Sequence, residues 1–140
     1  MFPKGYRLNN PGNIERGNDK WHGMAVQLDP RFITFDAPKW GIRAIIRIIM
    51  NYNRLNSNVD TVRAIINRWA PPVENNTDAY VDHVSSVLGV SPDDELTLNN
   101  ETLIKLSQAI ALHENGTSQN QFTYWYPDET YAEAVDLAAT

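Results

Sequence analysis

A stripe of isoleucines constrains the fold of this chain more than any other feature. Ile42, Ile45, Ile46 and Ile49 recur at the spacing of one α-helical face, shortly after Asp36. Aspartate accepts hydrogen bonds from the free N–H groups that begin a helix, so Asp36 is the expected N-cap. The sequence therefore predicts a helix with one apolar face behind Asp36.

Two further amphipathic segments follow this helix. Asn58 or Asp60 is suited to cap the first of them, and Pro71-Pro72 is suited to stop it. The second is expected to start at Thr77 and to end at Gly89, because glycine adopts the left-handed conformation common behind helices.

The remaining chain predicts two more helices and, near the N-terminus, one hairpin. A helix capped by Asn100 should end at Asn115-Gly116, and a short last one should begin at Asp128. The apolar runs 24–28 and 32–35 flank a turn and suggest two antiparallel strands. The expected fold is mainly α, or α+β: a bundle of about five helices with one β-hairpin.

Length and composition narrow the class further. The chain has 140 residues, the size of one domain, which we place at 1–140. It contains no cysteine, which excludes disulfides, thiolate metal sites and a cysteine nucleophile. The net charge of −5 disfavours nucleic acid as a partner, and Arg43, Arg47, Arg54 and Arg63 are expected on solvated helix faces.

No targeting or ligand-binding motif stands out. The N-terminus lacks the apolar core of a signal peptide and no segment could span a bilayer, so synthesis in the cytoplasm without membrane insertion is expected. His22, His83 and His113 are too scattered for metal-ligand spacing. We therefore expect neither a metal nor another cofactor.

The candidate catalytic groups are carboxylates, and Glu114 is the first choice. It shares a helical face with Leu103, Ile110 and Ala111, which places it at the core-facing edge of a helix end. Desolvation there favours a neutral carboxylic acid, as a general acid requires, and the negative end of the helix dipole acts in the same direction. The alternative is a glutamate that turns to solvent or pairs with His113.

Aromatic side chains are numerous for a chain of this size and suit a carbohydrate ligand. Sugar rings pack their C–H faces on aromatic rings, while amide and hydroxyl groups bind the sugar hydroxyls. Core packing is the competing explanation for each ring. The aromatic residues considered are Trp21, Trp40, Trp69, Trp125, Tyr80, Tyr124 and Tyr126.

Ordered motifs along nearly the whole chain resemble those of small virion-associated proteins of phages and prophages. The resemblance implies association with a virion and other virion proteins as partners, and it names no reaction. The motifs are Leu8 to Ile14, Trp21-His22-Gly23, Arg31 to Phe35, Gly41 to Ala44, Arg68 to Pro72, Glu74-Asn75 with Thr77, and Ala109-Ile110 with His113 to Gly116.

A more distant resemblance supplies a reaction. His113-Glu114-Asn115-Gly116 is similar to the end of the catalytic helix in glucosaminidases and lytic transglycosylases of the lysozyme superfamily, although Asn115 stands where serine is common. The resemblance implies a lysozyme-like fold, bacterial peptidoglycan as substrate, and Glu114 as general acid. This resemblance and the aromatic content together give the residues expected to bind sugar, which are Asn10, Asn13, Trp21, Tyr80, His113, Asn115, Tyr124 and Tyr126.

The motifs occur in a different order here, because the Glu114 helix follows the Asn-rich segment instead of preceding it. A circular permutation of the lysozyme-like fold would produce this order. It predicts that Glu114 and the segment from Asn10 to Trp21 lie across one cleft.

A second carboxylate is less clear. Asp29 and Asp36, at the ends of the predicted hairpin, are candidates, although a turn role for Asp29 and an N-cap role for Asp36 are the favoured explanations. A single-glutamate mechanism, in which the N-acetyl or hydroxymethyl group of the substrate attacks the anomeric carbon, is the alternative. Glu15 and Glu74 are rivals to Glu114 itself, Glu15 in polar surroundings and Glu74 after Pro71-Pro72.

Three functions remain open from the sequence. The first is cleavage of peptidoglycan glycan strands, by hydrolysis or transglycosylation, by a protein carried in the virion or released to the periplasm. The second is a non-catalytic virion or peptidoglycan-binding protein with the same fold. The third is an adaptor or inhibitor that binds a host protein through the aromatic cluster near Tyr124. An open groove beside Glu114 would favour the enzyme.

Overall fold

The computed structural model describes all 140 residues, and its regular secondary structure is helical. The helices are α1 (Lys4–Arg7), α2 (Pro38–Leu55), α3 (Val62–Trp69), α4 (Thr77–Leu88), α5 (Asn100–Asn115) and α6 (Asp128–Ala138). The expected mainly helical fold is confirmed, and the short α1 is an addition that the sequence did not predict. No helix combines the length and the apolar character needed to cross a membrane.

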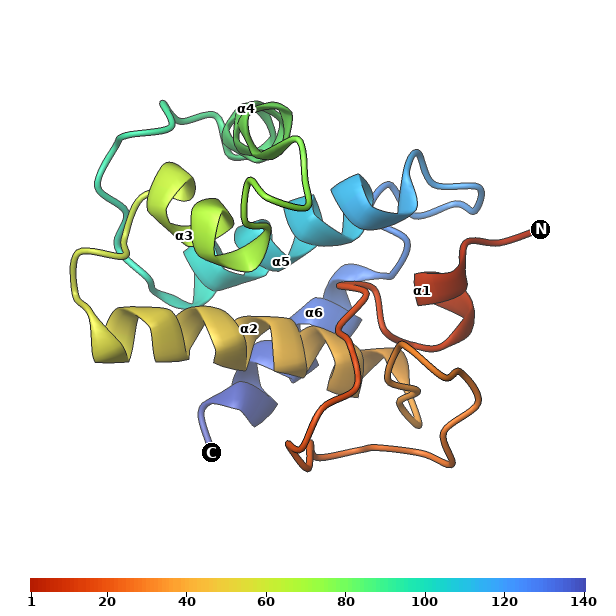
Figure 1. Ribbon diagram of the computed structural model, residues 1–140. Coiled ribbons are helices and arrows are strands. Elements are labelled where there is room, and N and C mark those ends of the chain that lie inside the picture. The colour runs from red at the N-terminus through yellow and green to blue at the C-terminus, as the bar shows by residue number, and fades with distance from the viewer.

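The helices pack around α5. Figure 1 shows α2 along one side of α5 and the pair α3 and α4 along the other, while α6 runs next to α2. The four isoleucines of the predicted stripe are fully buried in the main core cluster, which α5 and α6 complete. The two chain ends lie on different sides of the molecule in Figure 1.

The helix boundaries follow the predicted segments, but three of the expected caps are wrong. Helix α2 begins at Pro38, and Ala37 takes the N-cap position in place of Asp36, which is exposed. Thr61 caps α3 by accepting a bond from the Ala64 N–H, in place of Asn58 or Asp60. Asn99, one residue before the predicted Asn100, caps α5. Each cap is the residue whose backbone is extended at the first turn, which sequence patterns locate only approximately.

The ends of α4 and the start of α6 agree with the prediction. Helix α4 begins at Thr77 and is closed by Gly89, whose φ of 71° is left-handed. Helix α6 begins at Asp128.

The predicted hairpin pairs as expected but forms no strands. Met24 and Phe35 make an isolated antiparallel bridge, and Phe32 makes a second one with Glu15. The Gln27 carboxamide takes the place of ladder bonds, because it donates to the carbonyls of Ala25 and Thr34 and accepts from the Thr34 N–H. A side chain that occupies these backbone groups ends the ladder after one bridge.

The N-terminal segment is tied closely to α2 at Gly41. A Cβ built on Gly41 would overlap the carbonyl oxygen of Asn9, so only glycine fits there. Asn9 itself has a positive φ of 55°, and its amide donates to the Phe35 carbonyl. These contacts fix the Asn-rich segment against the start of α2 and so position the residues that follow it.

Candidate functional site

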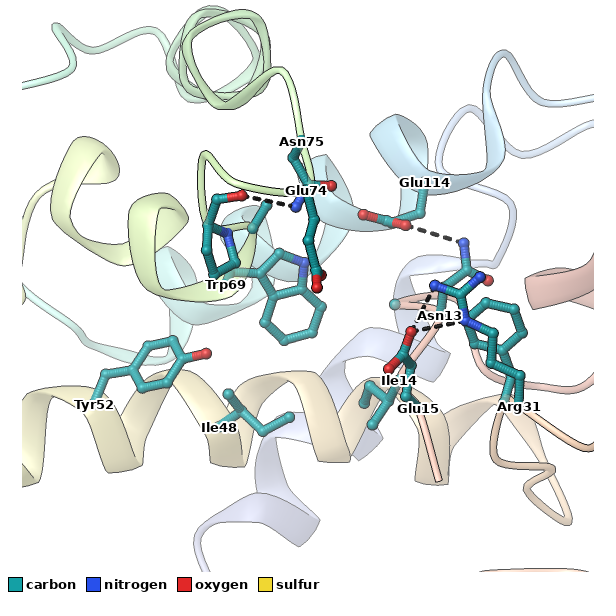
Figure 2. A pocket seen from close by; sticks show the side chains of 14 residues that line it. Asn13, Ile14, Glu15, Arg31, Ile48, Tyr52, Trp69, Glu74, Asn75 and Glu114 are labelled. Atoms are coloured by element: carbon teal, nitrogen blue, oxygen red, sulfur yellow. Dashed lines mark hydrogen bonds and ion pairs between the residues drawn. The ribbon is translucent and has the colours of Figure 1, made fainter. Parts of the chain in front are cut away.

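A cleft of about 370 Å³ opens where the Asn-rich segment, the loop between α3 and α4, and the end of α5 meet. Figure 2 shows Glu114 on one wall, with Glu74 and Trp69 across the space from it. Ile48 and Tyr52 of α2 form part of the lining below. The remaining lining residues are Gly12, Asn13, Ile14, Glu15, Arg31, Phe32, Ala70, Pro71 and Asn75.

Glu114 is half-buried and accepts a hydrogen bond on each carboxylate oxygen. Asn13 Nδ2 donates to Oε1 at 3.0 Å, and the Tyr80 hydroxyl donates to Oε2 at 2.8 Å. The buried neighbours Ile110 and Ala111 on the same helical face hold this last turn of α5 against the core. Glu114 is therefore fixed in orientation at the edge of open space, as its position in the sequence predicted.

Tyr80 is a dedicated donor to this carboxylate. Its side chain is almost completely buried, with 3% of the residue exposed. Burial, followed by the charge of Glu114 and the hydrogen bond to it, raises the pKa of Tyr80 well above its ordinary value, while a side-chain contact from Trp69 acts in the opposite direction. The hydroxyl thus keeps its proton and donates it to Glu114 as a hydrogen bond.

Two histidines lie behind Tyr80. The His113 ring stacks on the Tyr80 ring with centroids 3.7 Å apart, and its Nδ1 lies 2.9 Å from Nδ1 of His83. At that distance one ring must donate and the other accept. Burial, and secondarily the charge of His83, lower the pKa of His113. His113 therefore supports Tyr80 through stacking and does not line the cleft.

Asn10 and Asn115 have structural contacts in place of the expected contacts with sugar. Asn10 is fully buried, and its amide donates to the carbonyls of Ile14 and Ile33. Asn115 donates to the carbonyls of Pro11 and Ala111, so it ties the N-terminal segment to the end of α5. Neither residue lines the cleft, because the backbone of the turn uses their amide groups.

The other predicted sugar-binding aromatics lie outside the cleft. Trp21 lines two neighbouring hollows. Tyr126 is buried against Tyr6, and Tyr124 lines a separate hollow beside it. Of the eight residues predicted to bind sugar, Asn13 is in the cleft wall and Tyr80 reaches it through Glu114. The fold around the aromatic cluster places these rings outside the cleft. Sequence composition alone does not indicate where the rings lie.

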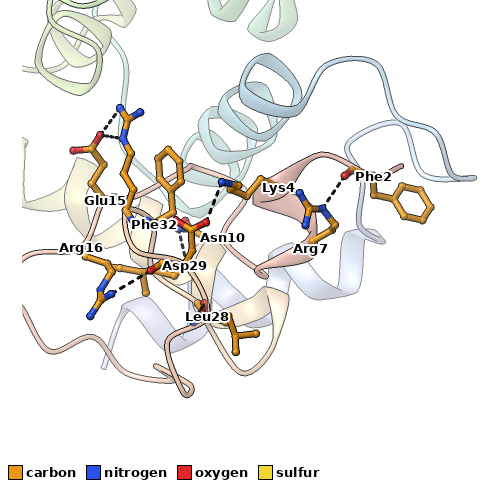
Figure 3. A network of polar contacts seen from close by, with 12 residues as sticks. Phe2, Lys4, Arg7, Asn10, Glu15, Arg16, Leu28, Asp29 and Phe32 are labelled. Carbon is orange, nitrogen blue, oxygen red and sulfur yellow. Dashed lines mark hydrogen bonds and ion pairs between the residues drawn. The ribbon is translucent and has the colours of Figure 1, made fainter.

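Asp29 and Asp36 are not positioned to act as the second catalytic carboxylate. Asp29 accepts from the N–H groups of Phe32 and Arg31 and pairs with Lys4 at 3.0 Å, as Figure 3 shows. The Phe32 and Arg31 hydrogen bonds, with Lys4, lower the pKa of Asp29 to about 2. It is thus a turn residue that is charged near neutral pH. Neither it nor the exposed Asp36 lines the cleft.

Glu15 and Glu74 do line the cleft together with Glu114. Glu15 is paired with Arg31 at 2.7 Å, whereas Glu74 has no ion-pair partner. By sequence both are rivals of Glu114, whereas the fold brings all three carboxylates to one cavity. Whether three carboxylates from distant parts of the chain meet depends on the paths of the loops, and no sequence motif indicates those paths.

Two lining residues, Ile48 and Tyr52, belong to none of the motifs or candidates identified from the sequence. Ile48 and Tyr52 are four residues apart on α2, beside the predicted apolar stripe, and this spacing could have identified them as one surface. No cluster of three or more His, Asp or Glu side chains could hold a metal ion in the structure.

Comparison with known proteins gives one clear relationship. No family model matches the chain. The sequence is 38% identical over 135 residues to "Protein P5" of Pseudoalteromonas phage PM2, a match that covers 89% of this chain and 81% of that protein.

Proposed function

This chain belongs to the family of Protein P5 of Pseudoalteromonas phage PM2, and from that premise we propose that it is a virion-associated enzyme that cleaves the glycan strands of bacterial peptidoglycan. Glu114 is the general acid. The observation that carries the proposal is the open cleft beside a half-buried glutamate that two side chains hold in place. An open cleft with convergent polar groups is the usual form of a ligand-binding or active site.

Glu114 protonates the glycosidic oxygen as the bond breaks. A positioned acid of this kind contributes about 10²–10⁴-fold to a rate. Tyr80 and Asn13 act by orientation: their hydrogen bonds fix the carboxyl group and, once the proton has left, stabilise the carboxylate. Both donors are available because Tyr80 stays protonated and the amide of Asn13 is neutral.

The lining of the cleft suits a sugar. Trp69 and Tyr52 supply aromatic surface for the C–H face of a ring, and Asn75 and Asn13 supply amide groups. Glu74 and Glu15 are the carboxylates available to activate water or to stabilise positive charge at the anomeric carbon. Hydrolysis with two carboxyls requires a separation of roughly 5–10 Å. Without such a pair, the N-acetyl or hydroxymethyl group of the substrate takes that role.

The arrangement supports a lysozyme-like origin with permuted order. The Asn13–Glu114 hydrogen bond joins residues 101 positions apart across one cleft, as the permutation hypothesis predicted for this pair. Trp21 lies outside the cleft, so the expected adjacency holds for only part of the Asn10–Trp21 segment.

A non-catalytic virion protein that binds peptidoglycan or other virion proteins is the second candidate. The relationship to Protein P5 favours it, because membership of a phage protein family requires no catalysis and a fold can outlast its activity. Both candidates place the protein in the virion, and they differ only in the chemistry at Glu114.

The test is the clearing of Gram-negative cells whose outer membrane has been permeabilised, measured as turbidity with purified protein. Glu114→Gln keeps the shape and removes the acid, and Glu95→Gln, at an exposed site outside the cleft, is the matched control. We expect clearing by the wild type and Glu95→Gln, and a loss of about 10²-fold or more in Glu114→Gln. Mass spectrometry of the fragments then distinguishes hydrolysis from anhydro-sugar formation.

Equal clearing by all three proteins would discard Glu114 as the acid. No clearing by any of them, with circular dichroism showing folded protein, would overturn the enzyme proposal and leave the binding or structural role.

A further inference from the structure

A basic hollow of about 290 Å³ lies beside α2, outside the proposed active site. Its lining includes three cationic side chains, Lys20, Arg43 and Arg47, and a single carboxylate, Asp19. The chain as a whole carries a net charge of −5, so this local excess of positive charge is unusual for the molecule. Trp21, His22 and Asn51 complete the lining.

Arg43 is buried, contrary to the solvated position expected from the sequence. Only 6% of the residue is exposed. Its Nε donates to the Leu137 carbonyl at 3.3 Å, and Nη1 of Arg47 donates to the Ala138 carbonyl at 3.0 Å. The two arginines thus bind the negative end of α6. Burial, and secondarily the charge of Arg47, lower the pKa of Arg43.

The arginine pair lacks an acidic partner. Arg43 and Arg47 are four residues apart on one helix, a spacing at which like charges repel. Neither takes part in any of the ion pairs of the molecule, and neither does Lys20. Each guanidinium has five N–H donors and makes one hydrogen bond, to a carbonyl at the end of α6, and both side chains line the hollow. This is the arrangement that binds an oxyanion, because planar guanidinium groups match carboxylate geometry.

The basic hollow and the cleft both adjoin a third hollow. A further hollow of about 330 Å³ shares Ile48 and Tyr52 with the cleft and shares Trp21 and Asn51 with the basic hollow. The three hollows therefore adjoin one another around α2, from Glu114 at one end to the two arginines at the other, and we call this row of hollows the groove. A ligand that fills the cleft and extends along this groove therefore reaches the positive charge.

We infer that Arg43, Arg47 and Lys20 bind a carboxylate of the peptide stem that is attached to the glycan strand in the cleft. This inference rests on the proposed function. Of the anions that could occupy the hollow, a stem carboxylate is covalently linked to the glycan and is delivered along the groove with it. The protein accordingly prefers peptide-bearing strands to bare glycan.

The test is binding, measured by calorimetry without catalysis, of two soluble probes: a disaccharide that carries a tetrapeptide stem and the same disaccharide without it. We expect the stem to improve the affinity of the wild type about tenfold, since charge-assisted bonds to arginine are strong. Lys20→Gln, at an exposed residue with no bond to the fold, and Arg47→Gln should remove this difference. Arg54→Gln, also on α2 but outside the groove, should keep it.

Thermal unfolding of each variant shows whether Arg47→Gln remains folded, and Lys20→Gln decides the outcome if it does not. A stem effect that survives in Lys20→Gln, or that Arg54→Gln also removes, would overturn the inference. Tight binding of inorganic phosphate to the wild type, with no stem effect, would reassign the hollow to phosphate. If the wild type did not clear cells but the stem still improved its affinity for the disaccharide, only the proposed reaction would be rejected.

Discussion

The amide of Asn13 donates a hydrogen bond of 3.0 Å to the carboxylate of Glu114, and the two residues are 101 positions apart in the chain. Asn13 lies in a turn with a left-handed φ of 50°, and Glu114 lies in the last turn of α5. The bond therefore ties two independently built elements together at the mouth of the cleft. The orientation of Glu114 depends on both of them.

The role of the Asn13 side chain and the cost of its left-handed backbone can be tested separately with two substitutions. Asn13→Gly removes the amide and tolerates a positive φ, whereas Asn13→Ala removes the amide and adds left-handed strain of about 1 kcal/mol. We expect both variants to lose cleavage similarly, and Asn13→Ala to have the lower free energy of unfolding in urea. Equal stability of the two would contradict the strained conformation.

Tyr80→Phe removes the second donor to Glu114 and keeps the buried ring. We expect the free energy of unfolding to fall by about 1–2 kcal/mol, because a hydrogen bond to a charged group is lost. Cleavage should fall about tenfold, because the acid is less well oriented. Tyr124→Phe, outside the cleft, is the control for loss of a hydroxyl. Wild-type behaviour of Tyr80→Phe in both measurements would show that the hydroxyl does not act on Glu114.

His113 should make stability depend on pH in the mildly acidic range. Its pKa is lowered in the folded protein, so the unfolded chain binds more protons below the ordinary value of 6.5. Stability is therefore full above pH 6.5 and decreases as the pH falls through that value toward the folded pKa. Asp29, with a pKa of about 2, loses its contribution only at far lower pH.

Urea unfolding between pH 8 and 5, at steps of about one unit, measures this dependence. The slope with pH should be smaller in His113→Gln and unchanged in His22→Gln, whose side chain is exposed. The slope, and not the absolute stability, is compared, because the first substitution also alters the stacking on Tyr80. An identical slope in all three proteins would remove His113 as its cause.

Gly41 should be intolerant of any side chain. A Cβ there would overlap the Asn9 carbonyl oxygen and lie 3.0 Å from Cδ of Pro11, so the Asn-rich segment would have to move off α2. We expect Gly41→Ala to lower the free energy of unfolding by roughly 2–3 kcal/mol or more. Gly17→Ala, where no heavy atom lies within 4 Å, should change it by less than about 0.5 kcal/mol. A neutral Gly41→Ala would show that the segment can shift without cost.

The local patterns that the sequence predicted correctly are those set by neighbours in the chain. The isoleucine stripe of α2, the stop at Gly89 and the start of α6 at Asp128 follow from helical periodicity and terminal preferences. Caps were displaced by one or more residues, because several side chains near each helix start could accept the same N–H. In the hairpin, the Gln27 side chain bonds to backbone groups that would otherwise pair between strands. A pattern of alternating hydrophobicity cannot predict this competition.

By itself the sequence determined where the five longer helices form and that Glu114 lies in the last turn of one of them, at its apolar edge, since both depend on residues within one or two turns. Only the tertiary structure decided that Glu15 and Glu74 face the same cleft, that Asn10 is buried, and that Arg43 leaves solvent for the end of α6. The physical reason is that a charged or amide side chain takes whichever partner the packing of distant segments brings to it. Such partners lie far along the chain and have no periodic pattern.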